Sequence, residues 1–181
     1  MSADIDKIFT AGGKELVDLL NYGVRAVQTD LLFVFLVEEY RNAPTSHKAV
    51  ALYEIFCAPQ SPARVSAAEL LPPFHPQMDV TLRPLRANVA AVNAARASGS
   101  PVPILLLPPK FIFDTIVQHL RKKSAGLRHI KRRYRAERTP SANLPHGRMS
   151  EAQRFFVDRV WTPNLRPRLI AVGFRRVASI G

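Results

Sequence analysis

Nine basic residues lie close together in the stretch from Arg121 to Arg138, where they could bind the phosphate groups of a polyanion. The stretch reads RKKSAGLRHIKRRYRAER and contains a single acid, Glu137. Like charges at this density repel one another unless counter-charge is supplied. Arginine dominates the basic residues of the chain, 19 of 26, and its planar guanidinium group suits bidentate contact with phosphate. The predicted chemistry is therefore phosphate binding.

We predict two sets of phosphate-binding residues, and we expect the first set to contribute more than the second. The first set is Arg121, Lys122, Lys123, Arg128, Lys131, Arg132, Arg133, Arg135 and Arg138, and the second is Arg166, Arg168, Arg175 and Arg176. Two simpler interpretations remain open. The run could be a solvated face that keeps the protein soluble, and the first three cations alone suit the negative end of a helix dipole.

Catalytic and metal-binding motifs are not found in the sequence. It has no phosphate loop, dinucleotide fingerprint, HExxH, GxSxG or CxxC motif, and its five histidines are scattered at spacings that no compact metal site requires. The lone Cys57 gives no disulfide framework. We therefore expect neither an enzyme nor a bound cofactor or metal.

The charge of the chain is concentrated in its last third. Residues 1–120 have a net charge of −1, whereas residues 121–181 have a net charge of +13. No apolar run approaches the roughly 20 residues that span a bilayer. Acids at Asp4, Asp6, Glu15 and Asp18 are unlike a cleavable presequence, so none is expected.

The segments that must position these cations are predicted to be mostly helices. Asp30 is a candidate N-cap for an almost wholly apolar helix over 31–40, and Ser46 for a helix over 47–58. Pro84 is expected to open a helix over 85–97, and Lys110–Lys123 is expected to be a helix with Gly126 as its C-cap.

The basic stretch is predicted to continue as a second helix over 127–138. Leu127, Ile130 and Tyr134 form a thin apolar stripe along it, which would seat the helix on the core and turn the cations outward. Tyr134 and His129 could instead stack on a base, but packing of Tyr134 under the helix is the favoured interpretation.

The rest of the chain is expected to be a proline-broken extension. Ser150 and Gln153 form a capping box for a helix over 151–161. The run 104–107 could be a short strand or an extended buried linker, and the run 169–172 could be an edge or augmenting strand. We predict a mainly α fold: a helical body over 1–126, which should fold without residues 139–181, and a basic helix with an extended Arg/Pro-rich arm over 127–181.

Two functions from different classes fit these observations. The first is a non-catalytic structural subunit of a large assembly, with a ribosome-like ribonucleoprotein favoured, and a mitochondrial one ahead of a cytosolic one. Its partners would be RNA, ribosomal RNA in particular, and neighbouring protein subunits. The second is a supernumerary peripheral subunit of a mitochondrial membrane complex that converts energy, whose cations contact anionic lipid headgroups or acidic subunits. In that case the apolar segments 31–37 and 104–107 would be subunit contacts.

Overall fold

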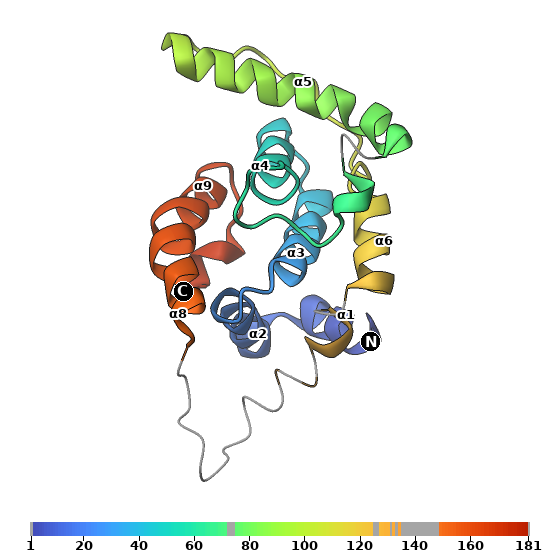
Figure 1. Cartoon of the computed structure of the whole chain (residues 1–181), viewed down its shortest axis with the longest axis vertical. Coiled ribbons are helices and arrows are strands. Elements are labelled where there is room, and N and C mark those ends of the chain that lie inside the picture. Colours follow the sequence, from blue (N-terminus) through green and yellow to red (C-terminus); the bar gives the residue numbers. More distant parts are fainter. Residues whose placement is uncertain are drawn as a thin grey trace.

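The most apolar stretch of the sequence, residues 31–37, forms the centre of helix α3 (Thr29–Asn42), and all of its side chains are buried. The computed structural model describes residues 2–71, 75–124, 127–130, 132, 134 and 149–180, with side chains from residue 7 onward. Helices α3 and α4 (Ser46–Phe56) lie at the centre, and the other helices surround them (Figure 1). The predicted mainly α fold is confirmed, and the described residues contain no strand.

Two helices precede α3 and pack beneath it. Gly12 separates helix α1 (Ser2–Ala11) from α2 (Gly13–Arg25), and Gly12 and Gly13 have φ angles of 66° and 72°, left-handed values that favour glycine. Leu16, Leu19 and Leu20 of α2 are buried, as their spacing indicated. The N-cap of α4 is Thr45, one residue before the expected Ser46, and its side chain accepts a hydrogen bond from the Lys48 N–H at 3.2 Å.

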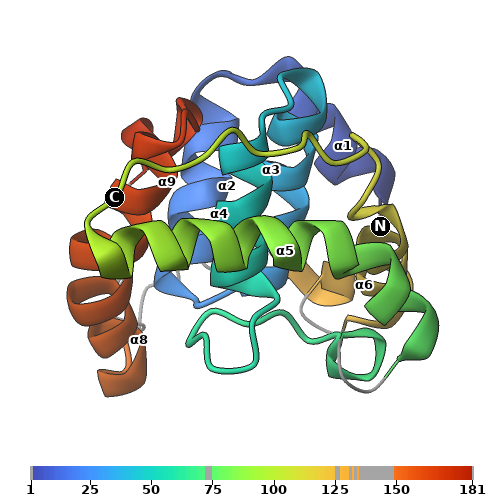
Figure 2. The same ribbon diagram turned by 90° about the horizontal axis from the view of Figure 1, so that it is seen from above.

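Helix α5 (Pro76–Ser98) crosses over α4 as an outer layer (Figure 2). It begins well before the expected Pro84, because the His75 side chain caps it and Pro76 occupies its first position. Pro84 lies inside the helix on its exposed side. The helix ends at Gly99, in the left-handed conformation typical of a C-cap.

An extended segment, residues 101–109, returns along α5 to α6 (Asp114–Lys123), which is preceded by turns over 110–113. No strand pairs with residues 104–107 in the described part of the chain, so this run is a linker. It is not buried: Ile104 is 102% exposed and Leu106 is 80% exposed. A short 3-10 turn, η1 (Ala68–Leu70), lies in the connection between α4 and α5.

Most of residues 151–180 are helical and this region packs on the body, which differs from the expected extended arm. The capping box at Ser150 and Gln153 is confirmed, and it opens α8 (Glu151–Phe155). A π-helix, η2 (Phe156–Leu165), continues directly into α9 (Arg166–Ala171), and a final 3-10 turn, η3 (Arg176–Ser179), follows. The strand predicted at 169–172 is wrong, since residues 169–171 belong to α9.

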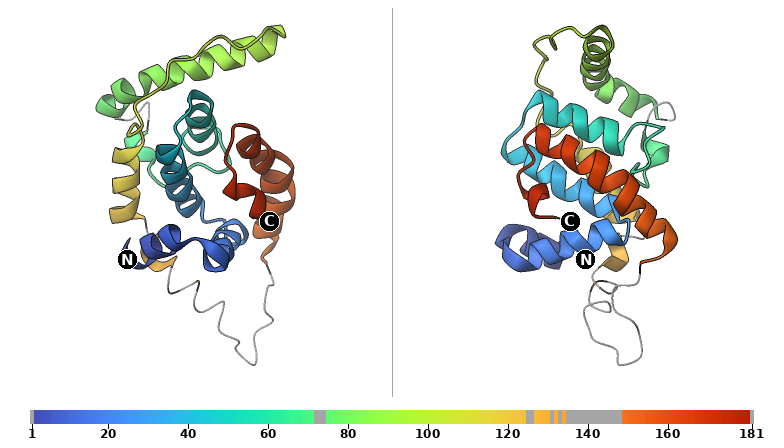
Figure 3. Two further views of the ribbon diagram at one scale, coloured as in Figure 1. Left: turned by 180° about the vertical axis from the view of Figure 1, so that it is seen from behind. Right: turned by 90° about the vertical axis from the view of Figure 1, so that its left-hand side faces the viewer.

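These C-terminal elements complete the hydrophobic core, and views from behind and from the side show them against the central helices (Figure 3). Trp161, Leu169, Phe174 and Val177 are each 0% exposed and join one cluster with the side chains of α2, α3 and α4. The sequence prediction missed this packing because it judged residues 162–180 by their prolines and arginines. Their apolar residues recur every three to five positions and supply a buried face.

Candidate phosphate-binding surface

The last turn of α6 carries three of the predicted cations. Lys122 and Lys123 are exposed, whereas Arg121 is half-buried and interacts within the chain. Their position at the C-terminal end of the helix also suits its dipole. Helix α6 is held to the body by Ile116, Val117 and Leu120, all of which are buried.

Residues 127–130, 132 and 134 are helical and lie beside α1 and α2 (Figure 1). The predicted apolar stripe is confirmed, because Leu127, Ile130 and Tyr134 are 2%, 0% and 5% exposed. The ring of Tyr134 packs against that of Tyr22 with centroids 5.6 Å apart. Tyr134 therefore packs under the helix, as favoured, and is not available to stack on a base.

The opposite side of this stretch faces solvent. Arg128, His129 and Arg132 are exposed. We call the four exposed cations Lys122, Lys123, Arg128 and Arg132 the basic surface. Within the described residues, no ion pair or hydrogen bond involves any of their side chains. Lys131, Arg133, Arg135 and Arg138 lie outside the described residues.

One carboxylate lies at the edge of the basic surface. Glu69 Oε1 is 2.5 Å from His119 Nε2 on α6. The pKa of Glu69 is lowered, first by a hydrogen bond with its own backbone and further by His119 and Lys123. Glu69 is exposed, so solvent screens its effect on the cations.

The four C-terminal arginines are placed differently from the basic surface. Arg166 donates from Nε to the Ile180 carbonyl at 2.9 Å and from Nη2 to the Ala178 carbonyl at 2.8 Å. Arg168 donates from Nη2 to Glu54 Oε2 at 2.7 Å, linking α9 to α4. These two side chains satisfy acceptors of the chain itself.

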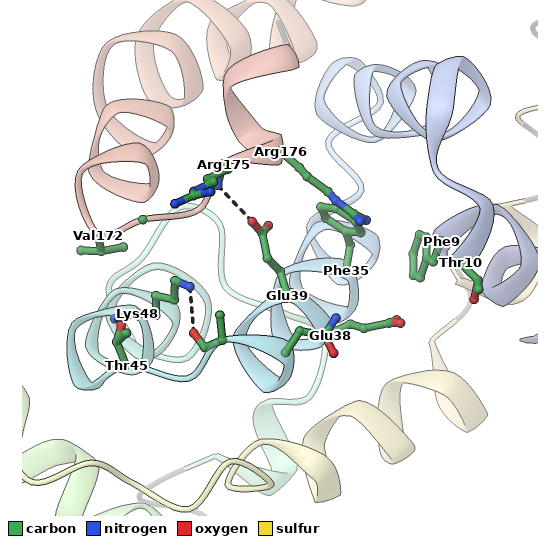
Figure 4. A pocket seen from close by; sticks show the side chains of 13 residues that line it. Phe9, Thr10, Phe35, Glu38, Glu39, Thr45, Lys48, Val172, Arg175 and Arg176 are labelled. Atoms are coloured by element: carbon green, nitrogen blue, oxygen red, sulfur yellow. Dashed lines mark hydrogen bonds between the residues drawn. The ribbon is translucent and has the colours of Figure 1, made fainter.

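Arg175 and Arg176 are exposed and line a cavity of about 680 Å³ between α1, α3, α4 and the turn after α9 (Figure 4). Glu38, Glu39 and Lys48 line the same cavity. Glu39 accepts a hydrogen bond from the Arg175 backbone N–H at 3.0 Å, and the Arg176 guanidinium carbon lies 5.9 Å from the centre of the Phe35 ring. Carboxylates among the cations make this cavity a poor match for a polyanion.

Sequence reasoning missed two acids that the structure shows to be important. Asp30 is not the N-cap of α3, which is Gln28, but a buried carboxylate in its first turn. Glu54, an ordinary helix acid in the sequence, joins α4 to α9 through its ion pair with Arg168. Arg96 of α5 is also near, with its Nη1 atom 3.9 Å from Glu54 Oε2. The one available signal was the position of each acid among apolar residues, since buried acids require partners.

The described residues contain no group of three or more His, Cys, Asp or Glu side chains that could hold a metal ion. Among the described helices, none has the length and apolar character needed to cross a bilayer. The chain matches no protein-family model, and no curated protein or solved structure is significantly similar to it.

Proposed function

We propose that this chain is a non-catalytic structural subunit of a ribosome-like ribonucleoprotein, with a mitochondrial assembly favoured, and that the basic surface binds RNA phosphates. One observation supports this proposal. On the helical stretch that follows α6, the apolar stripe is buried, whereas Arg128 and Arg132 are exposed and make no ion pair within the described residues. The stripe holds the helical stretch against the body, so Arg128 and Arg132 are partly ordered before they bind. Ordering in advance lowers the entropy loss on association.

The expected mode of binding is contact with the RNA backbone. Lysine and arginine side chains contact phosphates without reading sequence, and the aromatic residue that could have stacked on a base is buried. Affinity should therefore depend strongly on salt and weakly on RNA sequence.

A second feature supports membership of a protein assembly. Ile104, Leu106, Leu107 and Phe111 are all more than half exposed, on and next to the extended segment between α5 and α6. Large apolar side chains gathered on one exposed segment are typical of surfaces that contact another macromolecule. The proposed subunit would meet protein neighbours here and RNA at the basic surface.

The test replaces Lys122, Lys123, Arg128 and Arg132 together by glutamate and measures binding to a folded RNA hairpin across a salt titration. If each residue contacts one phosphate, log Kd of the wild type should change by about 3 for each log unit of salt. The variant should lose binding while its free energy of unfolding changes by no more than about 0.5 kcal/mol for each exposed charge.

The matched control replaces four exposed cations away from α1, α2 and the basic surface by glutamate: Arg83, Lys110, Arg154 and Arg159. Both variants change the net charge equally, so only a local phosphate site predicts that the control retains most of its binding. Equal losses in the two variants would contradict the proposed surface. If the wild type binds phosphatidylserine vesicles but no RNA in the same buffers, the membrane-complex alternative replaces the ribonucleoprotein.

A further inference from the structure

Asp30 joins three segments that are far apart in the sequence. Its carboxylate is 5% exposed and accepts a hydrogen bond from the Ser66 backbone N–H at 2.9 Å. It also accepts hydrogen bonds from the hydroxyl groups of Ser66 and Ser124. Ser66 lies in the connection after α4, and Ser124 follows α6 directly. Every described hydrogen bond of this carboxylate is therefore made to another segment of the chain.

Ser124 is the residue at which α6 ends and the next helical stretch begins. Its N–H donates to the Leu120 carbonyl at 2.9 Å, and its ψ angle of 116° takes the chain out of helical conformation. Its hydroxyl oxygen accepts a hydrogen bond from the Leu127 N–H at 3.3 Å, and its carbonyl accepts one from the Arg128 N–H at 3.0 Å. Ser124 therefore acts as an N-cap for residues 127–134.

The Asp30 carboxylate determines how this cap is oriented. A serine hydroxyl has one proton to donate, and Ser124 donates it to Asp30. The lone pairs of the same oxygen then remain available for the Leu127 N–H. A charged acceptor strengthens the first bond, and linked hydrogen bonds polarise one another. Without Asp30, the hydroxyl could rotate and donate to a carbonyl of α6 instead.

We propose that Asp30 is a positioning residue for the basic surface: through Ser124 it fixes the direction in which residues 127–134 leave α6. This direction sets the spacing between Lys122 and Lys123 on α6 and Arg128 and Arg132 on the following stretch. The consequence for RNA rests on the proposed function, but the positioning of the helical stretch does not. The two can therefore be measured separately.

The test compares Ser124→Ala with Ser66→Ala. Each variant removes one hydroxyl donor from Asp30, but only Ser124→Ala disconnects the carboxylate from the helical stretch. Hydrogen exchange of the amides of residues 127–130 should become about fivefold faster in Ser124→Ala, as expected for the loss of one cap. In Ser66→Ala these amides should exchange as in the wild type. Ser124→Thr keeps a hydroxyl and should restore protection.

RNA binding gives the second measurement. The slope of log Kd against log salt concentration should fall by about 1.4 in Ser124→Ala, because two phosphate contacts are misplaced. The slope should be unchanged in Ser66→Ala. Asp30→Asn changes side-chain volume little and leaves the Ser124 hydroxyl in place, so it tests the carboxylate itself. Exchange of residues 127–130 should become faster and the salt dependence should fall, as in Ser124→Ala. Exchange at the wild-type rate in Asp30→Asn would overturn the role of Asp30.

The two possible failures are distinguishable. Equal exchange of residues 127–130 in Ser124→Ala and Ser66→Ala would overturn the positioning role, whatever the RNA result. Wild-type protein that does not bind RNA would overturn the proposed function, while the exchange measurement would still decide the role of Asp30. Faster exchange with an unchanged salt dependence would show that the positioning does not serve RNA binding, and would overturn that part of the proposal.

Discussion

The two arginine-rich regions of the last third of the chain look alike in sequence and differ in the structure. In the basic surface, the cations are exposed and make no ion pair or hydrogen bond within the described residues. In α9, by contrast, Arg166 and Arg168 bind carbonyl and carboxylate oxygens of the chain itself. The density of positive charge is therefore a poor guide to binding by itself.

The difference arises from what lies opposite each helix. Arg168 faces Glu54, whose side chain is only 13% exposed and lies within 4 Å of two arginines. Residues 127–130, 132 and 134 pack through an apolar stripe, and Arg128 and Arg132 make no ion pair or hydrogen bond with acceptors in the described part of the chain. An arginine beside a largely buried acid cannot be removed without leaving that acid unpaired, whereas an arginine with no internal acceptor remains available to a partner.

The largest predicted effect tests whether the C-terminal region belongs to the core. Trp161 is fully buried, so Trp161→Ala should lower the free energy of unfolding by about 3–5 kcal/mol, measured by urea denaturation. Phe155, six residues earlier, is 63% exposed, and Phe155→Ala should change the same quantity by less than about 0.5 kcal/mol. Similar small effects in both variants would restore the view of residues 151–180 as an arm.

A smaller effect is predicted for the structural arginine. Arg168→Gln removes a hydrogen-bonded charge from Glu54 and should lower the free energy of unfolding by about 2 kcal/mol, with little change in RNA binding. Arg159→Gln is the control, because Arg159 is exposed and makes no ion pair within the described residues. If Arg168→Gln weakened RNA binding as strongly as loss of the basic surface, the distinction between the two regions would fail.

The smallest predicted effect concerns pH and the body of the fold. Burial raises the pKa of the Cys57 thiol from 9.0 to about 12 and also raises the pKa of the Tyr40 and Tyr53 hydroxyls above 10.0. Each group holds its proton more tightly in the folded chain, so its stabilising contribution is complete below pH 9 and is lost as pH rises toward the folded pKa.

At pH 10 the Cys57 thiol alone should account for a loss of about 1 kcal/mol, measured as the difference in unfolding free energy between pH 8 and pH 10. Cys57→Ala should show a correspondingly smaller difference between the two pH values. An identical pH dependence in both proteins would mean that the thiol is not protected by burial.

Much of the fold could be predicted because local signals agreed with the final packing. The apolar run 31–37, the glycine pair before α2, the capping box at Ser150 and the stripe of 127–134 all act within a few residues. The exposure of Arg128 and Arg132 followed from that stripe. Each of these features depends on periodicity or capping, which sequence reveals directly.

The features that were missed depend on contacts between distant residues. Asp30 accepts hydrogen bonds from Ser66 and Ser124, which are 36 and 94 residues away in the sequence, and Glu54 accepts one from Arg168, 114 residues away. Pro84 is tolerated inside α5 because the helix is stabilised by its packing on α4, which outweighs the local preference for a break. Local patterns contain no information about such partners.

The late position of the core-completing helices has a consequence for the synthesis of the protein. Residues 156–177 cover apolar side chains of α2 and α4, so this face stays open until these later residues have been synthesised. At typical rates of synthesis, about 5–20 residues per second, the earlier helices would wait for several seconds with apolar surface exposed. A nascent chain of this kind is a natural client for chaperones that hold unfinished proteins, and its cooperative folding is expected only once residues 156–177 have left the ribosome.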